Sequence, residues 1–334
     1  MSLVPVIDLA PAAAGEAGRR QVAAAVAAAC ERVGFLVVTG HGVPAGVIDG
    51  GWAAARAFFD LDEAAKRAVA MPHPGYPYGY SPVAGESLAR SLGDHRPPDL
   101  KESFSIGPAD LVPPPAVGGE AAEFAWAANL WPAAPPGFRD AMLAYYRALS
   151  GLAGRLMRLF ALGLTLPEDF FDSRIDRAIS ALRLLNYPDQ AVPPEPGQLR
   201  AGAHTDYGSL TILLPQDAPG GLEVQGPSGP DGRGWHAVPA VPGGFVINLG
   251  DLMARWTNDR WRSTLHRVVN PPPDAAGSTR RQSIAFFHQP NWEAEIACLP
   301  TCLAPGEAPK HPPVLSGPHL ASKFRSTVTL PAVP

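Results

Sequence analysis

The chain has 334 residues and a formal net charge of -4, and 46% of its residues are hydrophobic. A chain of this length can bury a sizeable core, in one large domain or two modest ones. The mild negative charge provides no basic surface for nucleic acid or an anionic membrane. No apolar run of about 18 residues is present, so we expect no transmembrane helix. The odd set of three cysteines lacks zinc-ligand spacing and favours a reduced, cytoplasmic compartment.

The first half of the sequence predicts mainly helices. The strand-like VPVID (4–8) and FLVVTG (35–40) flank an Ala-rich helix that ends at Gly34, and two more helices are predicted over 45–61 and 62–70. A Pro- and Gly-rich loop is predicted from Met71 to about Gly119, with one ordered piece at KESFSIG. The longest helical pattern covers 136–164, where apolar residues recur three and four positions apart.

The second half predicts strands. Short apolar runs separated by Gly, Pro and Asn turns lie at 180–188, 209–214, 221–226, 234–240, 244–251, 263–270 and 281–290. This spacing is typical of a sandwich, jelly roll or barrel. A last helix is predicted at 318–328. We therefore expect one compact unit with an N-terminal region (1–175), a β core (176–295) and a C-terminal tail with its helix (296–334).

The stretch AGAHTDYGSLTILL (201–214) holds an imidazole and a carboxylate two residues apart. If the segment is a strand, His204 and Asp206 project to the same face. Burying both is costly unless they bind a metal ion or form an ion pair. His266, between apolar neighbours in STLHRVVN, is the best third ligand. Two His and one Asp form the facial triad of non-haem iron, with zinc as the rival metal.

A second pair lies on the last predicted strand. Arg281 and Ser283 in RQS face the same way, and an Arg with a hydroxyl on an inward face makes a carboxylate clamp. Tyr187, at the end of LRLLNYP, is placed to add a hydrogen bond. An H-x-D motif alone is a weak signal, whereas the ordered series N-Y-P, H-x-D, H-R-V, R-x-S is specific.

With these motifs the sequence resembles the iron(II)- and 2-oxoglutarate-dependent dioxygenases of the isopenicillin N synthase-like group. VPVIDLA, GFLVVTGHGVP and FFDL are similar to the family's N-terminal region, and NYP, HTDYGSLTILL, VINLGDLMARWTND, STLHRVV and RQSIAFF to its core. The resemblance implies a double-stranded β-helix (jelly-roll) core with an N-terminal helical and strand cover. The chain departs from plant members, which often have a second Tyr where this one has Asn186.

The resemblance also implies roles for these residues. His204, Asp206 and His266 would hold Fe(II), and Arg281, Ser283 and Tyr187 would bind 2-oxoglutarate. With O2, such an enzyme hydroxylates, desaturates or cyclises a small-molecule metabolite, often in secondary metabolism. Two alternatives remain open: a 2-oxoglutarate-independent oxidase that uses R-x-S for a substrate carboxylate, and a metal-free binding protein on the same fold. The oligomeric state is not readable.

Four further residues are candidates for substrate contact. Arg183 shares a strand face with Tyr187, and Phe287 shares one with Arg281. An Arg and an aromatic ring would suit a substrate with a carboxylate or another acceptor, unless Arg183 pairs with an acid such as Glu102. The loop from Met71 to Ile106 is a candidate lid. Its punctuating pieces YGYSP and KESFSIG contain the other two candidates, Tyr80 and Phe104.

Overall fold

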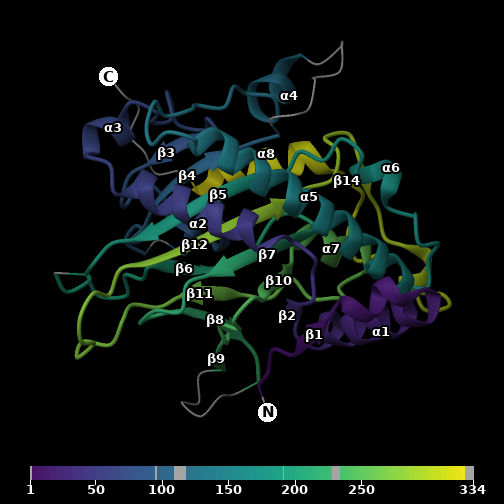
Figure 1. Cartoon of the computed structure of the whole chain (residues 1–334). Coiled ribbons are helices and arrows are strands. Elements are labelled where there is room, and N and C mark those ends of the chain that lie inside the picture. The colour runs from purple at the N-terminus through teal and green to yellow at the C-terminus, as the bar shows by residue number, and fades with distance from the viewer. Residues whose placement is uncertain (1, 95, 109–117, 191, 228–233, 328–334) are drawn as a thin grey trace.

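The protein is described from a computed structural model that covers residues 2–94, 96–108, 118–190, 192–227 and 234–327. It is a mixed α and β structure with two large sheets, antiparallel except where β1 and β2 run parallel (Figure 1). The larger sheet has the order β1 (Val6–Asp8), β2 (Phe35–Thr39), β10 (Phe245–Leu249), β7 (Leu210–Pro215), β12 (Arg281–His288), β5 (Ala181–Tyr187), β4 (Glu102–Ile106), β3 (Gly79–Ser81). The smaller one has the order β6 (Ala201–His204), β11 (His266–Val268), β8 (Leu222–Gln225), β9 (Trp235–Ala237). A further pair joins β13 (Glu295–Ile296) and β14 (Val314–Leu315).

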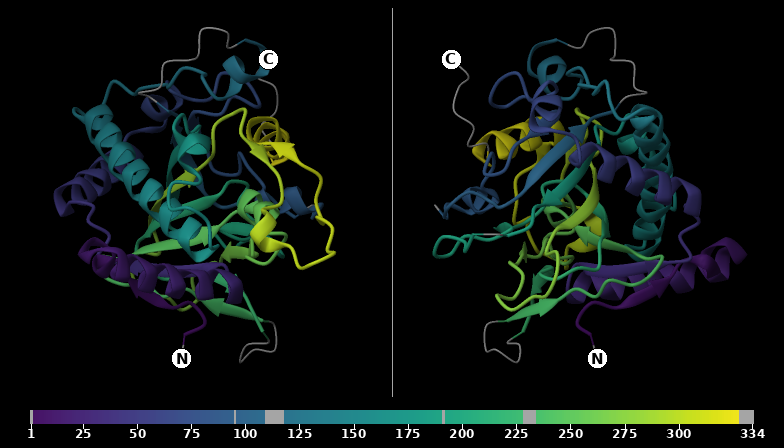
Figure 2. Two further views of the ribbon diagram at one scale, coloured as in Figure 1. Left: turned by 90° about the vertical axis from the view of Figure 1, so that its right-hand side faces the viewer. Right: turned by 60° about the vertical axis from the view of Figure 1, so that its left-hand side comes forward.

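The helices are concentrated in the N-terminal half. They are α1 (Glu16–Arg32), α2 (Ala45–Phe59), α3 (Glu63–Arg67), α4 (Gly119–Phe124), α5 (Phe138–Gly163), α6 (Asp172–Ile175), α7 (Asp251–Trp256) and α8 (Ser316–Thr327), with 3-10 turns η1 (Ala10–Ala14), η2 (Leu88–Leu92) and η3 (Pro300–Cys302). Helices α1 and α5 lie on the same side of the sheets, and α8 lies apart from them (Figure 2). Among the described residues, no helix is both long and apolar enough to cross a membrane.

The two-residue period of the strands divides the core in two. On β12, Ile284 and Phe286 face the helices and join a large apolar cluster with residues of α1, α2 and α5. Ala285, between them, belongs to a smaller cluster whose members come from both sheets. Each fully buried large apolar side chain stabilises the fold by about 1.5–3 kcal/mol relative to exposure. The larger sheet is thus held by the helices on one face and leaves its other face for the site.

Most predicted elements are confirmed, and the exception is the segment after Met71. We expected an irregular loop up to about Gly119 with one ordered piece at KESFSIG. That piece is β4, but the segment also contains a second strand, β3, and both extend the edge of the larger sheet beyond β5. The part of it within 109–117 lies outside the described residues. Strands this short are specified by pairing with a distant neighbour, which local sequence does not show. The region 1–175 therefore supplies four strands of the larger sheet.

Candidate active site

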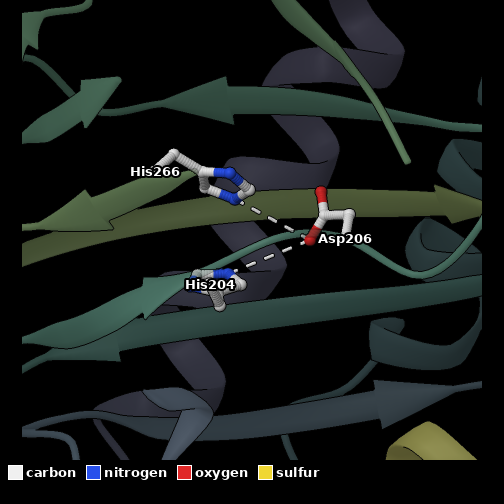
Figure 3. Close-up of side chains that lie close together, drawn as sticks. All are labelled: His204, Asp206 and His266. Atoms are coloured by element: carbon white, nitrogen blue, oxygen red, sulfur yellow. Dashed lines mark ion pairs between the residues drawn. The ribbon is translucent and has the colours of Figure 1, made fainter. Parts of the chain in front are cut away.

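Three side chains that are distant in sequence meet between the two sheets. His204 is the last residue of β6, Asp206 lies in the following turn, and His266 begins β11. Asp206 Oδ1 is 3.9 Å from His204 Nε2 and 3.8 Å from His266 Nε2 (Figure 3). One nitrogen or oxygen atom from each residue lies within 4.8 Å of the others. All three residues are at most 9% exposed.

The way Asp206 reaches the site differs from the expectation. We predicted that His204 and Asp206 share one face of one strand, but the chain leaves β6 after His204, and β7 starts only at Leu210 in the other sheet. His204 instead pairs across β6 and β11 with His266, and their ring centroids are 4.3 Å apart. The turn that carries Asp206 connects the two sheets, so all three side chains converge although no single strand holds them.

Backbone carbonyls orient both imidazoles. His204 Nδ1 is 2.7 Å from the Gly202 oxygen, and His266 Nδ1 is 3.0 Å from the Thr264 oxygen. A carbonyl only accepts, so each Nδ1 carries the proton and each Nε2 presents a lone pair toward Asp206. Burial, together with the nearby His266, lowers the pKa of His204 to about 3. His204 is therefore neutral at pH 7, which is the form that binds a metal.

Asp206 is held as a carboxylate by two donors on the larger sheet. Asn248 Nδ2 and Thr211 Oγ1 donate to its Oδ2 over 2.6 and 2.5 Å, which leaves Oδ1 directed at the histidines. Burial by itself would raise the pKa of Asp206, but the two imidazoles and these hydrogen bonds lower it below its usual value. Asn248 and Thr211 are cross-strand partners on β10 and β7. Sequence reasoning missed both, although the Asn in the apolar run VINL was a signal.

A cavity extends from this cluster along the inner face of β12. Arg281, Ser283, Ala285 and Phe287, two residues apart, all line it, as the strand period requires. Tyr187 lines it as well and is the cross-strand partner of Arg281. The structure thus brings the predicted R-x-S pair and Tyr187 into the same cavity as the three metal-ligand candidates.

Arg281 is a buried cation without a carboxylate partner. It is 3% exposed, and its guanidinium carbon lies 5.5 Å from the centre of the Tyr187 ring. Within the described part of the chain, no carboxylate is at ion-pair distance from it. Burial lowers its pKa below the usual value, and Tyr187 partly opposes this effect. A buried guanidinium facing a cavity is costly unless an anion joins it, so this end of the cavity is suited to a carboxylate.

Of the four predicted substrate contacts, the structure brings two to the cavity. Arg183 and Phe287 both line it, and the guanidinium carbon of Arg183 lies 5.8 Å from the centre of the Phe287 ring. Arg183 does have a carboxylate partner, but it is Glu86, at 3.2 Å, and not Glu102. Glu102 pairs instead with Lys66 at 2.8 Å.

Tyr80 and Phe104 do not reach the cavity. They are cross-strand partners on β3 and β4, and both belong to the large cluster under the helices, where Phe58 packs against each ring. The expectation treated their segment as a lid whose aromatic residues face the iron. Because the segment is part of the sheet, alternate residues point to opposite faces, and these two point away from the site.

Several cavity residues were not foreseen. They come from the segment before β4, from the end of β12 and from α8, and they include Glu86, Leu88, Lys101, Gln289, Leu320 and Phe324. The sequence pattern of α8 predicted a helix but did not place it over the site. Its position results from long-range packing against η2, where the Ser87 nitrogen donates to the Thr327 oxygen at 3.3 Å.

His288 is a buried histidine outside the cavity, on the opposite face of β12 from Phe287. Its Nδ1 is 2.7 Å from Ser209 Oγ, and burial lowers its pKa to about 4. A group with a depressed pKa in the folded state binds protons mainly when unfolded, so its contribution to stability is lost as the pH falls below the unfolded value near 6.5. We expect this residue to lower the free energy of unfolding of the metal-free protein by about 2 kcal/mol between pH 7 and 5.

Chemical unfolding across this pH range, with the wild type and His288→Gln, checks the expectation. The variant should be less stable at pH 7 but should show a shallower pH dependence. Identical slopes for wild type and His288→Gln would contradict the assignment.

Comparisons with known proteins agree with this geometry. The family described as non-haem dioxygenase in morphine synthesis N-terminal matches residues 4–134, and the 2OG-Fe(II) oxygenase superfamily matches residues 179–290. The 2-oxoglutarate-Fe(II) type oxidoreductase hxnY of Emericella nidulans is 35% identical over 93% of this chain and 86% of its own. Validamycin A dioxygenase of Streptomyces hygroscopicus subsp. limoneus is 36% identical over 89% of this chain and 79% of its own.

Solved structures show the same likeness. A full-length Neurospora crassa protein, crystallised in complex with alpha-KG and thymine, superposes with a TM-score of 0.81 at 31% identity, and the match covers 96% of both chains. The chain therefore belongs to the 2OG-Fe(II) oxygenase superfamily, within the isopenicillin N synthase-like family, and its sheets form that family's jelly roll. It is an oxidoreductase, a dioxygenase that depends on iron(II), 2-oxoglutarate and O2 and acts on a small molecule.

Proposed function

We propose that His204, Asp206 and His266 hold the iron(II). Two neutral imidazole nitrogens and one carboxylate oxygen form the donor set of a facial triad, which leaves positions open for other ligands. Their ligand atoms lie within 4.8 Å of one another, and all three residues line the cavity. The fixed Nδ1 protons and the Asn248 and Thr211 hydrogen bonds keep these atoms directed at one point, as ligand-orienting contacts do in metal sites.

We further propose that Arg281, Ser283 and Tyr187 bind the distal carboxylate of 2-oxoglutarate. The observation that carries this assignment is the unpaired, 3% exposed Arg281 at one end of the cavity that holds the triad. A guanidinium binds a carboxylate through two parallel hydrogen bonds. Ser283, one strand period further along β12, adds a hydroxyl, and Tyr187 adds a phenol from β5.

Bound iron(II) supplies the oxidation of a substrate C–H bond by O2, while 2-oxoglutarate becomes succinate and carbon dioxide. The chain's own residues bind and orient. The two imidazole Nε2 atoms and the Asp206 carboxylate would provide the donor atoms, because each Nδ1 is directed at a backbone carbonyl. Arg281 fixes one end of the co-substrate, and apolar side chains such as Leu213 and Val268 line the cavity and exclude water. Whether the product is hydroxylated, desaturated or cyclised depends on the substrate.

We propose that the substrate lies in the part of the cavity that 2-oxoglutarate leaves free. Arg183 and Phe287 line the cavity, and the segment around Glu86 and the helix α8 contribute to its wall. Relatives act on diverse small molecules, as the name of validamycin A dioxygenase and the thymine complex of the Neurospora crassa protein show. We propose a metabolite of similar size, such as those of secondary metabolism, and no nucleic-acid or membrane partner.

The regions 1–175, 176–295 and 296–334 have distinct proposed roles within one unit. The first supplies helices and edge strands, the second carries the triad and the carboxylate clamp, and the third covers the cavity with α8. A reducing, cytoplasmic compartment stays a prediction. Within the described residues, Cys30, Cys298 and Cys302 are all free thiols, and Cys30 is fully buried.

Succinate formation tests the function directly. The purified protein with iron(II), 2-oxoglutarate and O2 should produce succinate slowly by itself and faster when a substrate is added. Zinc in place of iron should support binding of 2-oxoglutarate but no turnover. If neither succinate nor any oxidised product formed across a broad panel of metabolites while iron and 2-oxoglutarate were bound, the chain would be a binding protein on this fold.

A further inference from the structure

Four buried charges form one cluster at the cavity, on β5 and in the segment before β4. Glu86 pairs with Arg183 at 3.2 Å and with Lys101 at 3.1 Å, and Lys101 pairs with Asp99 at 2.5 Å. The side chains of Glu86 and Arg183 are 13% and 17% exposed, and those of Lys101 and Asp99 are 3% exposed. All but Asp99 line the cavity itself. No role in iron or 2-oxoglutarate binding has been assigned to any of them.

The cluster is electrically balanced. Although burial opposes ionisation, Lys101 and Arg183 lower the pKa of Glu86 to about 2. The carboxylates of Asp99 and Glu86 in turn raise the pKa of Lys101 above its usual value against the effect of burial. Glu86 and Lys101 are therefore both charged at pH 7, and the ion pairs of the cluster match two carboxylates with two cations. Arg183 has no free charge with which to hold a substrate carboxylate, contrary to what its sequence position suggested.

The other charges of the cavity are used by the co-substrate and the metal. Of the two charges of 2-oxoglutarate, one is matched by Arg281 and the other by the metal centre, where Asp206 already neutralises part of the metal's charge. A charged substrate would therefore enter a low-dielectric cavity without a counter-ion. Entry of a cationic or an anionic substrate is costly, because an unpaired charge loses its hydration without compensation.

A further polar group that lines the cavity is left without a partner. Gln289 is 3% exposed and lines the cavity, and its Oε1 has no hydrogen-bond partner. Its position is fixed, because its backbone nitrogen donates to Ser180 Oγ at 3.2 Å and its amide nitrogen packs against Gly208. A Cβ atom at position 208 would lie only 2.6 Å from the Gln289 amide nitrogen, so the close contact requires glycine there.

The strand geometry places Gln289 at the end of β12 opposite Arg281. Thr211, which donates to Asp206, pairs with Phe287 across β7 and β12. Arg281 lies six residues before Phe287 on β12, and Gln289 lies two residues after it, a step of about 7 Å along an extended chain. Along β12 the cavity therefore has the carboxylate clamp at one end and Gln289 at the other, and the pair of Phe287 and Thr211 lies nearer to Gln289.

We propose that the substrate is an uncharged small molecule with an N–H or O–H group that donates to Gln289 Oε1, and that Glu86 enforces this selectivity by neutralising Arg183 and Lys101. A buried acceptor without a partner costs about 1–3 kcal/mol, and a donor on the substrate removes that cost. The inference rests on the proposed function, because it assumes that 2-oxoglutarate occupies the Arg281 end.

Matched sets of ring compounds test the substrate class. Each set contains a lactam with a free N–H, its N-methyl derivative, the cyclic amine as a cation and the ring carboxylate as an anion. Dissociation constants are measured on the anaerobic iron(II)–2-oxoglutarate complex. The N–H lactam should bind roughly tenfold or more tightly than the other three, which corresponds to about 1.4 kcal/mol. Tighter binding of a charged or N-methyl member, or no binding of any N–H lactam, would overturn the proposal.

Two variants assign the selectivity to residues. Glu86→Gln leaves the cluster with an excess positive charge, so preference should shift toward the carboxylate by roughly tenfold or more. Gln289→Leu should weaken binding of the N–H lactam by roughly tenfold and leave the affinity for the N-methyl lactam unchanged. Glu102→Gln is the control, since Glu102 is a still more deeply buried carboxylate that pairs with Lys66 and does not line the cavity. It should keep the wild-type preference.

The affinity for 2-oxoglutarate, measured in the same titrations, separates two kinds of failure. A wild type that does not bind 2-oxoglutarate refutes the proposed function, whereas normal 2-oxoglutarate binding with the wrong substrate preference refutes only the substrate class. If Glu86→Gln does not fold, Arg183→Leu provides the opposite change, because the leftover carboxylate should favour the cyclic amine. A preference unchanged in every folded cluster variant would show that the cluster is purely structural.

Discussion

Asp206→Ala is expected to abolish turnover and to weaken iron(II) binding more than any change outside the triad. The substitution removes the one anionic donor and leaves two neutral imidazoles, and it also leaves Asn248 Nδ2 and Thr211 Oγ1 without the carboxylate oxygen that they share. Loss of an outer hydrogen-bond partner alone typically costs 10–100-fold in metal affinity, so loss of the ligand itself should cost about 100-fold or more.

Metal analysis and iron titration check this expectation on a graded series. Asn248→Ala removes one donor to Asp206. Its affinity for iron(II) should lie between those of the wild type and Asp206→Ala, with a loss of roughly 10–100-fold. Asp172→Ala, at an exposed pair with Arg158 2.7 Å away, is the matched control and should bind iron like the wild type. His204→Ala and His266→Ala should behave like Asp206→Ala. Full iron occupancy in the purified Asp206→Ala or His204→Ala protein would remove these residues from the metal site.

Arg281→Ala is expected to raise the apparent constant for 2-oxoglutarate by about a hundredfold to several thousandfold, because breaking a buried ion pair costs roughly 3–5 kcal/mol. The co-substrate's carboxylate would then be stranded in the cavity without a cation. Arg281→Lys keeps a positive charge but loses the bidentate geometry. Its apparent constant for 2-oxoglutarate should therefore lie between those of the wild type and Arg281→Ala. Succinate formation at varied 2-oxoglutarate concentration provides the measurement.

The neighbouring residue offers a close control. Arg280 points to the other side of the strand, where it bonds to Asp60 at 2.5 Å and to Asn186 at 2.9 Å. Arg280→Ala should therefore alter stability but not the constant for 2-oxoglutarate. If both variants raised that constant equally, the effect would come from general disturbance of β12. A wild type that oxidised its substrate at full rate without 2-oxoglutarate would instead assign Arg281 to a substrate carboxylate.

The local sequence pattern was sufficient to predict which residues on regular strands line the cavity. Arg281, Ser283 and Phe287 line the cavity because a strand places alternate residues on one face, and the same period brought Arg183 and Tyr187 to it from β5. The order of the motifs along the chain predicted the triad of His204, Asp206 and His266. The strands of the β core were likewise readable, because each is a short apolar run bounded by turn residues.

Other features depend on which segments meet, and local sequence does not encode that. Asp206 reaches the histidines through a turn between two sheets, and Tyr80 and Phe104 face away from the cavity because β3 and β4 join the sheet edge. The sequence by itself determined the chemistry of the site, since residue types and strand period define which donors and which carboxylate clamp are present. Only the tertiary structure decided whether Arg183 offers a free charge to a substrate. Its partner, Glu86, lies 97 positions away in the sequence, and a charge is free or neutralised according to its neighbours in space.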